Sequence, residues 1–123
     1  MESLGPYEPI SNQESEMSLD VHLEVIAPTQ VYWANITHNL GKMAGEAGIY
    51  QHLWRPEELE ITTASELIKP LQVALKDLRE RPEYFKQFNP ENGWGDYDGF
   101  VQWVSNYLGA CVGNPLATIR VSR

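Results

Sequence analysis

The residues of this chain whose types and spacing could support chemistry are two amides, an imidazole and an ammonium group: Asn35, His38, Asn39 and Lys42. They follow one another at i, i+3, i+4 and i+7, so they form one polar stripe if the segment 31–48 is a helix. The amides and the imidazole supply directional donors and acceptors, and Lys42 supplies a point charge. This combination is typical of a surface that binds a phosphate-bearing or other polar small ligand.

Three further residues are expected to complete such a ligand site. Arg55 would add a bidentate guanidinium fork, and Trp33 or Trp54 would offer a ring for stacking. An alternative stays open, in which His38 and the two amides hydrogen-bond the backbone of the segment 49–59 and hold that connector in place. The polar stripe is therefore either a ligand surface or an internal latch.

Patterns for catalysis or metal binding are weak. The three histidines have no compact ligand spacing and are spread along the chain: His22, His38 and His52. We therefore expect no metal site and no cofactor. Cys111 falls on the apolar face of a predicted helix, where a thiol is inert. Glu57 and Glu58 follow a proline, which suits the first turn of a helix better than acid–base work. We expect a non-enzymatic protein, with a small hydrolase that uses His38 as the alternative.

The net charge of −8 bounds the choice of partners. Residues 1–17 hold four glutamates and no Lys or Arg, and we expect them to form a disordered acidic leader. A negative chain does not attract nucleic acid or anionic membranes, so neither is an expected partner. Because the chain has one cysteine and no apolar run that suits a signal peptide or a membrane span, we expect a cytoplasmic protein, in the host cytoplasm if it is viral.

The hydrophobic pattern predicts the elements that position these residues. Alternation over 18–26 and again over 117–122 predicts two half-buried strands. Three main helices are expected between them, over residues 31–48, 63–81 and 96–113. Their N-terminal caps would be Thr29, a capping box of Thr63 with Glu66, and Asp96.

These elements predict an α+β fold that is mainly helical. The three main helices would pack on one face of a small sheet formed by the N- and C-terminal strands, because a lone strand leaves its backbone groups unpaired. Residues 18–123 would form this single compact domain. Arg120 would lie on the outer sheet face, near Glu24, His22 or Asp20.

Glycines and tryptophans give further expectations about contacts. Gly41 and Gly45 predict a close approach to the first helix, either by a neighbouring helix or by a ligand. Trp94 stands between two glycines of the loop 89–95 and is expected to point inward and pin that loop. Trp103 is out of phase with the apolar face of the third helix. It marks a partner or oligomer contact, or it packs against the leader or the loop.

Several stretches carry a resemblance to other proteins: SLDVHLEV, VYWANITHNLGKMAGEAGIYQHLWRPEEL, LIKPL, PEYFKQFNPENGWGDYDGFVQWV and the terminal VSR. In these stretches, which cover nearly everything after Met17, the chain resembles a family of small uncharacterised proteins encoded by phages and bacteria. The resemblance implies a stand-alone accessory protein of viral or mobile-element origin. Such proteins often act on host proteins or sequester small molecules.

The leading hypothesis is therefore a non-enzymatic binding protein of the phage accessory or counter-defence type. It would hold a polar, nucleotide-like small ligand or a host protein through the polar stripe and the connector 49–59. The alternatives are the hydrolase that uses His38 and a structural protein that assembles as a homo-oligomer and buries Trp103.

Overall fold

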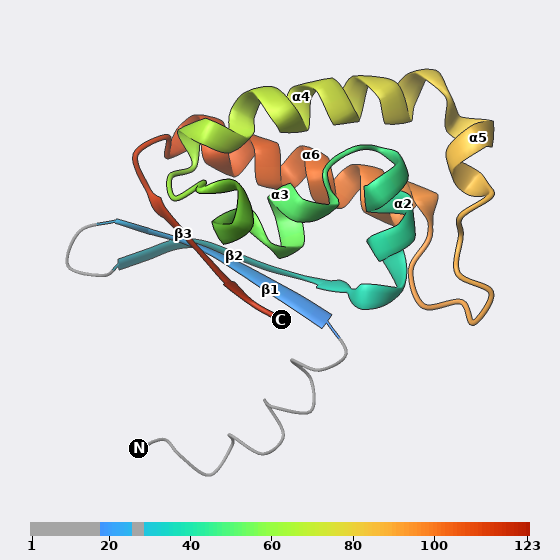
Figure 1. The fold of residues 1–123 in the computed structure, drawn as a ribbon, viewed down its shortest axis with the longest axis horizontal. Helices are drawn as coiled ribbons and strands as arrows, with labels where there is room; N and C mark the ends of the chain where they lie inside the picture. The colour runs from blue at the N-terminus through green and yellow to red at the C-terminus, as the bar shows by residue number, and fades with distance from the viewer. Residues whose placement is uncertain (1–17, 26–28) are drawn as a thin grey trace, which may run out of the picture.

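The computed structural model of the protein describes residues 18–25 and 29–123. The expected acidic leader, residues 1–17, lies outside the described residues. What is described is an α+β arrangement in which one antiparallel sheet is covered by helices (Figure 1).

The sheet has three strands in the order β2-β1-β3: β1 (Ser18–Val25), β2 (Thr29–Thr37) and β3 (Thr118–Ser122). The predicted pairing of the two terminal strands is confirmed, because β1 and β3 are antiparallel neighbours with His22 opposite Arg120. Arg120 lies near Glu24, as predicted, and the two form an ion pair in which Nη1 is 3.1 Å from Glu24 Oε2. The sheet differs from the prediction in its third strand, β2, which pairs with the other side of β1.

The predicted first helix, over 31–48, is wrong. In its place the chain continues as the strand β2, then forms a 3₁₀ turn η1 (His38–Leu40) and a short helix α2 (Gly41–Glu46). The strand is favoured because TQVYWANIT is rich in β-branched and aromatic side chains. Thr29, expected to cap that helix, begins the strand instead. The true cap is Thr37, whose hydroxyl accepts from the Asn39 N–H at 3.2 Å.

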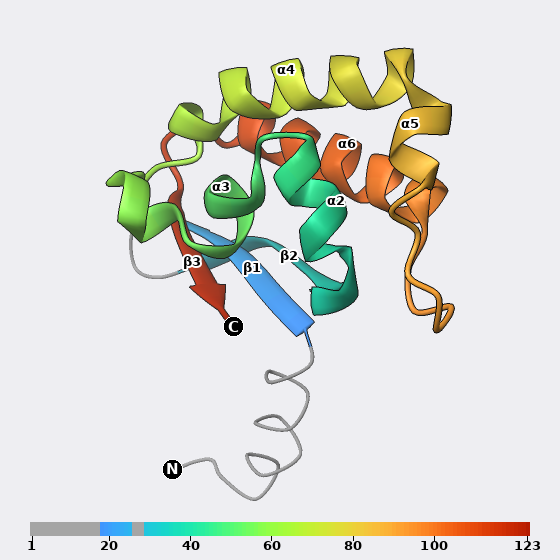
Figure 2. The same ribbon diagram turned by 45° about the vertical axis from the view of Figure 1, so that its right-hand side comes forward.

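The remaining helices follow in chain order: α3 (Tyr50–Trp54), the 3₁₀ turn η2 (Pro56–Leu59), α4 (Ser65–Glu80), α5 (Pro82–Lys86) and α6 (Tyr97–Gly113). Figures 1 and 2 show them on one face of the sheet, with the long helices α4 and α6 side by side. Two of the three predicted main helices, α4 and α6, are thus confirmed.

The helix α6 begins at its predicted cap, Asp96, whereas the N-cap of α4 is Ala64, which makes no side-chain capping hydrogen bond. Glu66 Oε2 accepts from the Thr63 N–H and hydroxyl at 3.2 and 2.9 Å, which is one half of the predicted capping box. These hydrogen bonds lower the pKa of the Glu66 carboxyl because they favour its charged form. The other half is not formed, because the Glu66 N–H donates to the backbone carbonyl of Thr63 and not to its side chain. Asp96 Oδ1 accepts from the Gly99 N–H at 2.7 Å at the start of α6. A side-chain cap therefore marks the start of α6, and the Thr63–Glu66 contact lies at the start of α4.

One buried cluster holds the sheet and the helices together. The inward face of β1 supplies Leu19, Val21 and Leu23, each fully buried, and the helices cover them with fully buried side chains such as Leu71 and Phe100. The opposite face of the sheet carries the polar members of the alternation. No helix among the described residues covers that outer face (Figure 1).

Trp103 has a role that the sequence did not indicate. Its indole N–H donates to the backbone carbonyl of Asn35 at 2.9 Å, and its ring makes an edge contact with Tyr107. This hydrogen bond ties α6 to the outer edge of β2. The expected contact of Trp103 with the leader lies outside the described residues.

Candidate functional site

The strand β2 divides the polar stripe. Asn35 lies on the outer face of the sheet, where its Nδ2 atom donates to Ser18 Oγ at 2.8 Å and to Asp20 Oδ1 at 2.6 Å. His38, Asn39 and Lys42 follow the strand, on η1 and α2. The four residues therefore do not form one surface, because a 3.6-residue spacing aligns side chains only within one helix, and Asn35 belongs to a strand that ends at Thr37.

His38 faces the connector. Its Nδ1 atom accepts a hydrogen bond of 2.6 Å from the indole N–H of Trp54, which is 2% exposed and stacks on Tyr50 at 5.1 Å. An Nδ1 that accepts is unprotonated. This contact is the latch that the alternative interpretation expected, made to a side chain of the segment 49–59 instead of its backbone. Buried in this way, the Trp54 ring offers no face to a ligand.

Two further candidates also lie away from Lys42. Arg55 forms an ion pair with Glu58, with 3.2 Å between Nη1 and Oε2. Trp33 is half exposed on the outer face of the sheet, opposite His22 on β1. The structure thus brings neither the guanidinium nor this indole to the Asn39 and Lys42 side chains.

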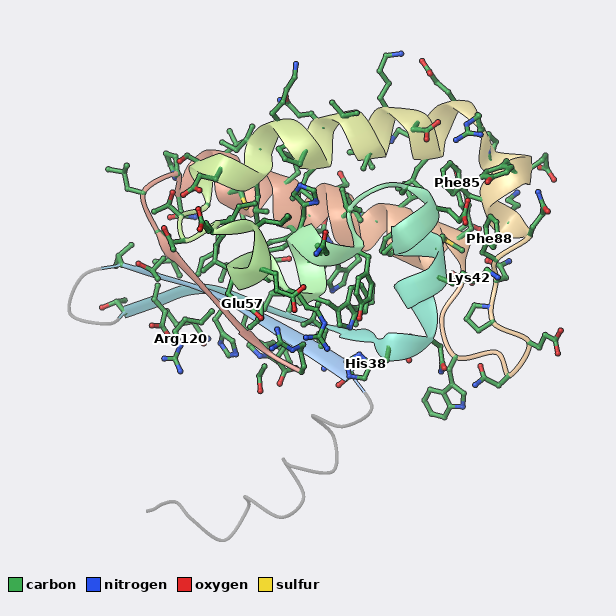
Figure 3. All side chains as sticks on the ribbon, viewed as in Figure 1. His38, Lys42, Glu57, Phe85, Phe88 and Arg120 are labelled. Carbon is green, nitrogen blue, oxygen red and sulfur yellow. The ribbon has the colours of Figure 1, made fainter. Side chains whose placement is uncertain are left out.

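Asn39 and Lys42 do share a surface with each other and with a distant segment. They line an open depression of about 580 Å³ whose other wall is the chain after α5, so its lining consists of Asn39, Lys42, Gln87, Phe88, Asn89, Pro90, Glu91 and Asn92. Lys42 Nζ stands 5.7 Å from the centroid of the Phe88 ring (Figure 3). We call this feature the amide depression, because four of its eight lining residues carry side-chain amides.

A glycine fixes the far wall against η1. Gly95 has φ +96°, and a Cβ added there would lie 2.9 Å from Leu40 Cγ and from Thr37 Cγ2. Only glycine permits both this backbone conformation and this close approach. Asn89 Oδ1 also accepts from the Tyr97 N–H at 2.7 Å, which joins the loop to the start of α6. The two segments that bound the depression are therefore both fixed in position by contacts with their neighbours.

Trp94 does not pin the loop, and the expectation that it points inward is wrong. Its side chain is 68% exposed, and its backbone N–H donates to Asn92 Oδ1 at 2.9 Å. The positive φ angles of Gly93 and Gly95 on either side allow the sharp reversal that places it outward. The loop is anchored by Gly95, and it presents Trp94 to solvent.

The chemistry of the amide depression is that of binding. Lys42 is the one cation and Glu91 the one carboxylate among the lining residues, and the amides supply both donors and acceptors. No lining residue is a histidine, cysteine, serine or threonine. The sequence identified Asn39 and Lys42 but missed Gln87–Asn92; the density of amides in QFNPEN was the signal that could have found them.

Other reactive side chains have structural roles. Cys111 is fully buried on α6, and this burial raises the pKa of its thiol to about 12, so it stays protonated and unreactive.

The first close approach predicted for a glycine is confirmed, since a Cβ on Gly41 would lie 3.3 Å from the Tyr50 ring. The second is wrong, because nothing lies within 4 Å of a Cβ on Gly45.

Within residues 18–25 and 29–123, no three His, Cys, Asp or Glu side chains gather where they could hold a metal ion. In the same part of the chain, no helix has both the length and the apolar character needed to cross a membrane. Comparisons with protein-family models, with curated proteins and with solved structures found no match.

Proposed function

We propose that this is a non-enzymatic binding protein that holds a small polar ligand of the nucleotide type in the amide depression. The observation that carries the proposal is the meeting of the Lys42 ammonium with four side-chain amides and the Phe88 ring around one open volume. The site replaces the polar stripe and keeps two of its members, Asn39 and Lys42.

Each part of a nucleotide has a counterpart in this lining. The Lys42 ammonium suits a phosphate group as a point charge. Amides present a donor and an acceptor side by side, which matches the edge of a base or a pair of ribose hydroxyls. The Phe88 ring offers an apolar face for stacking. Because Glu91 lies on the same wall, a ligand with few phosphates is favoured over a triphosphate, whose added charge the carboxylate would repel.

A binding role fits this lining better than turnover does. A hydrolase needs a nucleophile or a general base beside the substrate, and His38 would have been that base. In a catalytic histidine the Nδ1 atom carries a proton and donates to an orienting carboxylate. In this protein Nδ1 accepts from Trp54 instead, so the geometry gives the hydrolase alternative no support.

The counter-defence role implied by the resemblance to phage and bacterial proteins is part of this proposal. Sequestering a nucleotide signal requires affinity and no chemistry, which suits a depression built from amides and one ammonium group. Such a protein acts in stoichiometric amounts, so its affinity for the ligand is the property to measure.

Calorimetric titration with nucleoside monophosphates tests the proposal. We expect binding to the wild type and its loss in a variant that combines Asn39→Ala with Lys42→Ala. Lys69→Ala is the matched control, because Lys69 is also an exposed lysine on a helix but lies outside the depression. A ligand present at 100 times its Kd should also stabilise the fold by about 2.7 kcal/mol. Equal responses of wild type and double variant to every nucleotide would refute the site.

A host protein is the second candidate ligand, and one observation favours it. Trp94 is 68% exposed on the loop that forms the wall of the depression, and exposed tryptophans are enriched among the residues that dominate protein interfaces. Trp94→Ala should then abolish capture of the host protein while nucleotide binding is unchanged. If nucleotide binding depends on Trp94 and no protein is captured, the small-ligand function alone stands.

A further inference from the structure

The loop that forms one wall of the amide depression contains a dipeptide with its own chemistry, Asn92 followed by Gly93. Among the asparagines of the sequence, Asn92 alone precedes a glycine. A glycine has no side chain to hinder approach to its backbone nitrogen, and its backbone adopts many conformations at low cost. The Gly93 nitrogen can therefore reach Cγ of Asn92 and close a five-membered ring.

The local geometry favours this ring closure. Asn92 Oδ1 accepts from the Trp94 N–H at 2.9 Å, which folds the side chain back over the intervening Gly93 peptide. The same hydrogen bond draws electron density from Cγ, so that carbon becomes more electrophilic. The Gly93 N–H makes a long contact of 3.3 Å with the Pro90 carbonyl, beyond the usual range of hydrogen bonds. Because Asn92 and Gly93 are both exposed, hydroxide can reach this N–H and remove its proton.

A second asparagine of the same wall is protected from this reaction. Asn89 also lines the depression, but the residue that follows it is Pro90, whose nitrogen carries no proton to lose. Asn89 Oδ1 accepts from the Tyr97 N–H at 2.7 Å and so joins the loop to α6. The amide that anchors the loop is therefore stable, whereas Asn92 in the same lining is reactive.

We propose that Asn92 is a site of spontaneous deamidation, and that this modification turns the amide depression from a binder of anionic ligands into a surface that repels them. The Gly93 nitrogen loses its proton and bonds to Asn92 Cγ. The bond from Cγ to Nδ2 breaks, and Nδ2 takes up a proton and leaves as ammonia. Water then opens the resulting succinimide at either of its carbonyl carbons, which produces aspartate or isoaspartate.

The consequence for binding rests on the function proposed above. In the unmodified protein the lining has one cation, Lys42, and one carboxylate, Glu91. Deamidation of Asn92 adds a second carboxylate next to Glu91 in the chain, so the lining changes from neutral to net negative. Because both carboxylates would repel a phosphate held by Lys42, the affinity for a nucleoside monophosphate should fall by about tenfold. The age of the protein would then limit how long it sequesters a ligand.

Mass spectrometry with fragmentation tests the modification. After incubation of the wild type at mildly alkaline pH, Asn92 should gain the mass that separates OH from NH2 and yield both aspartate and isoaspartate, faster as pH rises. Asn39 and Asn106 lie in helical turns before larger residues and should keep their amides. Asn92→Gln is the matched control and should gain no mass at this position, because a glutamine would have to close a less favourable six-membered ring. Reaction at Asn92 no faster than at Asn39 and Asn106 would overturn the proposal.

Calorimetric titration of the same samples with a nucleoside monophosphate tests the consequence. Incubated wild type and fresh Asn92→Asp should each bind about tenfold more weakly than fresh wild type. Asn92→Gln should bind equally before and after incubation, and circular dichroism checks that every sample is folded. If deamidated and fresh wild type bind equally well, the predicted loss of binding is refuted. If fresh wild type binds no nucleotide, the proposed function fails and the loss of binding falls with it, while the mass measurement alone decides whether Asn92 deamidates.

Discussion

Replacing His38 tests whether one side-chain hydrogen bond fastens η1 to the connector. The Trp54 indole N–H, which belongs to a side chain only 2% exposed, donates to His38 Nδ1 at 2.6 Å. In His38→Leu the side chain keeps much of its bulk and loses the acceptor. A buried donor that loses its acceptor destabilises the fold by about 1–3 kcal/mol. We therefore expect the free energy of unfolding to fall by an amount in that range, measured by urea unfolding followed by circular dichroism.

His38→Asn is the matched control, because its Oδ1 atom stands close to the position of the imidazole Nδ1 and also accepts. It should retain most of the stability that His38→Leu loses. The same pair of substitutions in a Trp54→Phe background removes the donor first, so there the two variants should differ little. Equal losses in His38→Leu and His38→Asn, or a loss below about 0.5 kcal/mol in His38→Leu, would refute the view that this hydrogen bond acts as the latch.

Three further predictions concern other buried or constrained groups. The Oη atom of Tyr107 is buried and has no hydrogen-bond partner among the described residues. Tyr107→Phe should therefore raise the free energy of unfolding, measured by urea titration, by about 1 kcal/mol. A decrease would contradict this prediction. Burial lowers the pKa of His52 below its ordinary value of 6.5. The unfolded chain therefore binds more protons than the folded chain, and the free energy of unfolding should fall as pH drops through 6.5. His52→Gln should flatten the curve of stability against pH between about pH 8 and pH 5, and an unchanged curve would contradict the prediction. Gly95→Ala should cost more stability than Gly93→Ala, about 2–4 against about 1 kcal/mol in thermal unfolding, because both have positive φ but only Gly95 contacts Leu40 and Thr37.

Local signals in the sequence were enough to predict α4, α6 and the pairing of β1 with β3. The Asp96 cap and the Thr63–Glu66 contact each lie within one turn, so the interaction at each helix start is visible in a few residues. Strand alternation is equally local, and it placed Arg120 on the same face as Glu24. In these elements, the intrinsic preference of the residues and their tertiary environment favour the same structure.

The segment that became β2 gave two competing signals. Small and apolar residues from Ile36 to Ala47 recur with helical spacing, which favours a helix that also includes the preceding residues VYWANIT. The intrinsic preference of Val31, Tyr32 and Trp33 for a strand was the better guide there. Tyr32 shows the result, since it faces inward and stacks on Tyr107 of α6 at 5.9 Å. If this segment were a helix, the side chains that neighbour Tyr32 would point away from the face that packs on α6.

The sequence predicted only part of the candidate site. There is a physical reason why some of its residues were predicted correctly and others were not. Asn39 and Lys42 are close in sequence and lie on consecutive turns, so their proximity did not depend on what preceded them. The position of Asn35 did depend on the preceding structure, because the strand β2 places this residue on the outer face of the sheet. A local pattern therefore remains informative only within the element that contains it.

The opposite wall of the amide depression depends on a contact that no local pattern encodes. The loop 89–95 reads as a turn, and its glycines indicate positive φ. What the sequence does not say is that Gly95 would be pressed against Leu40, which brings Gln87–Asn92 over Lys42. If Gly95→Ala moves that wall, the loss in the free energy of nucleotide binding should exceed the loss in the free energy of unfolding at the assay temperature. Gly93→Ala should leave binding intact. Loss of binding in both variants would show that general loosening of the loop, and not the contact with Leu40, governs the site.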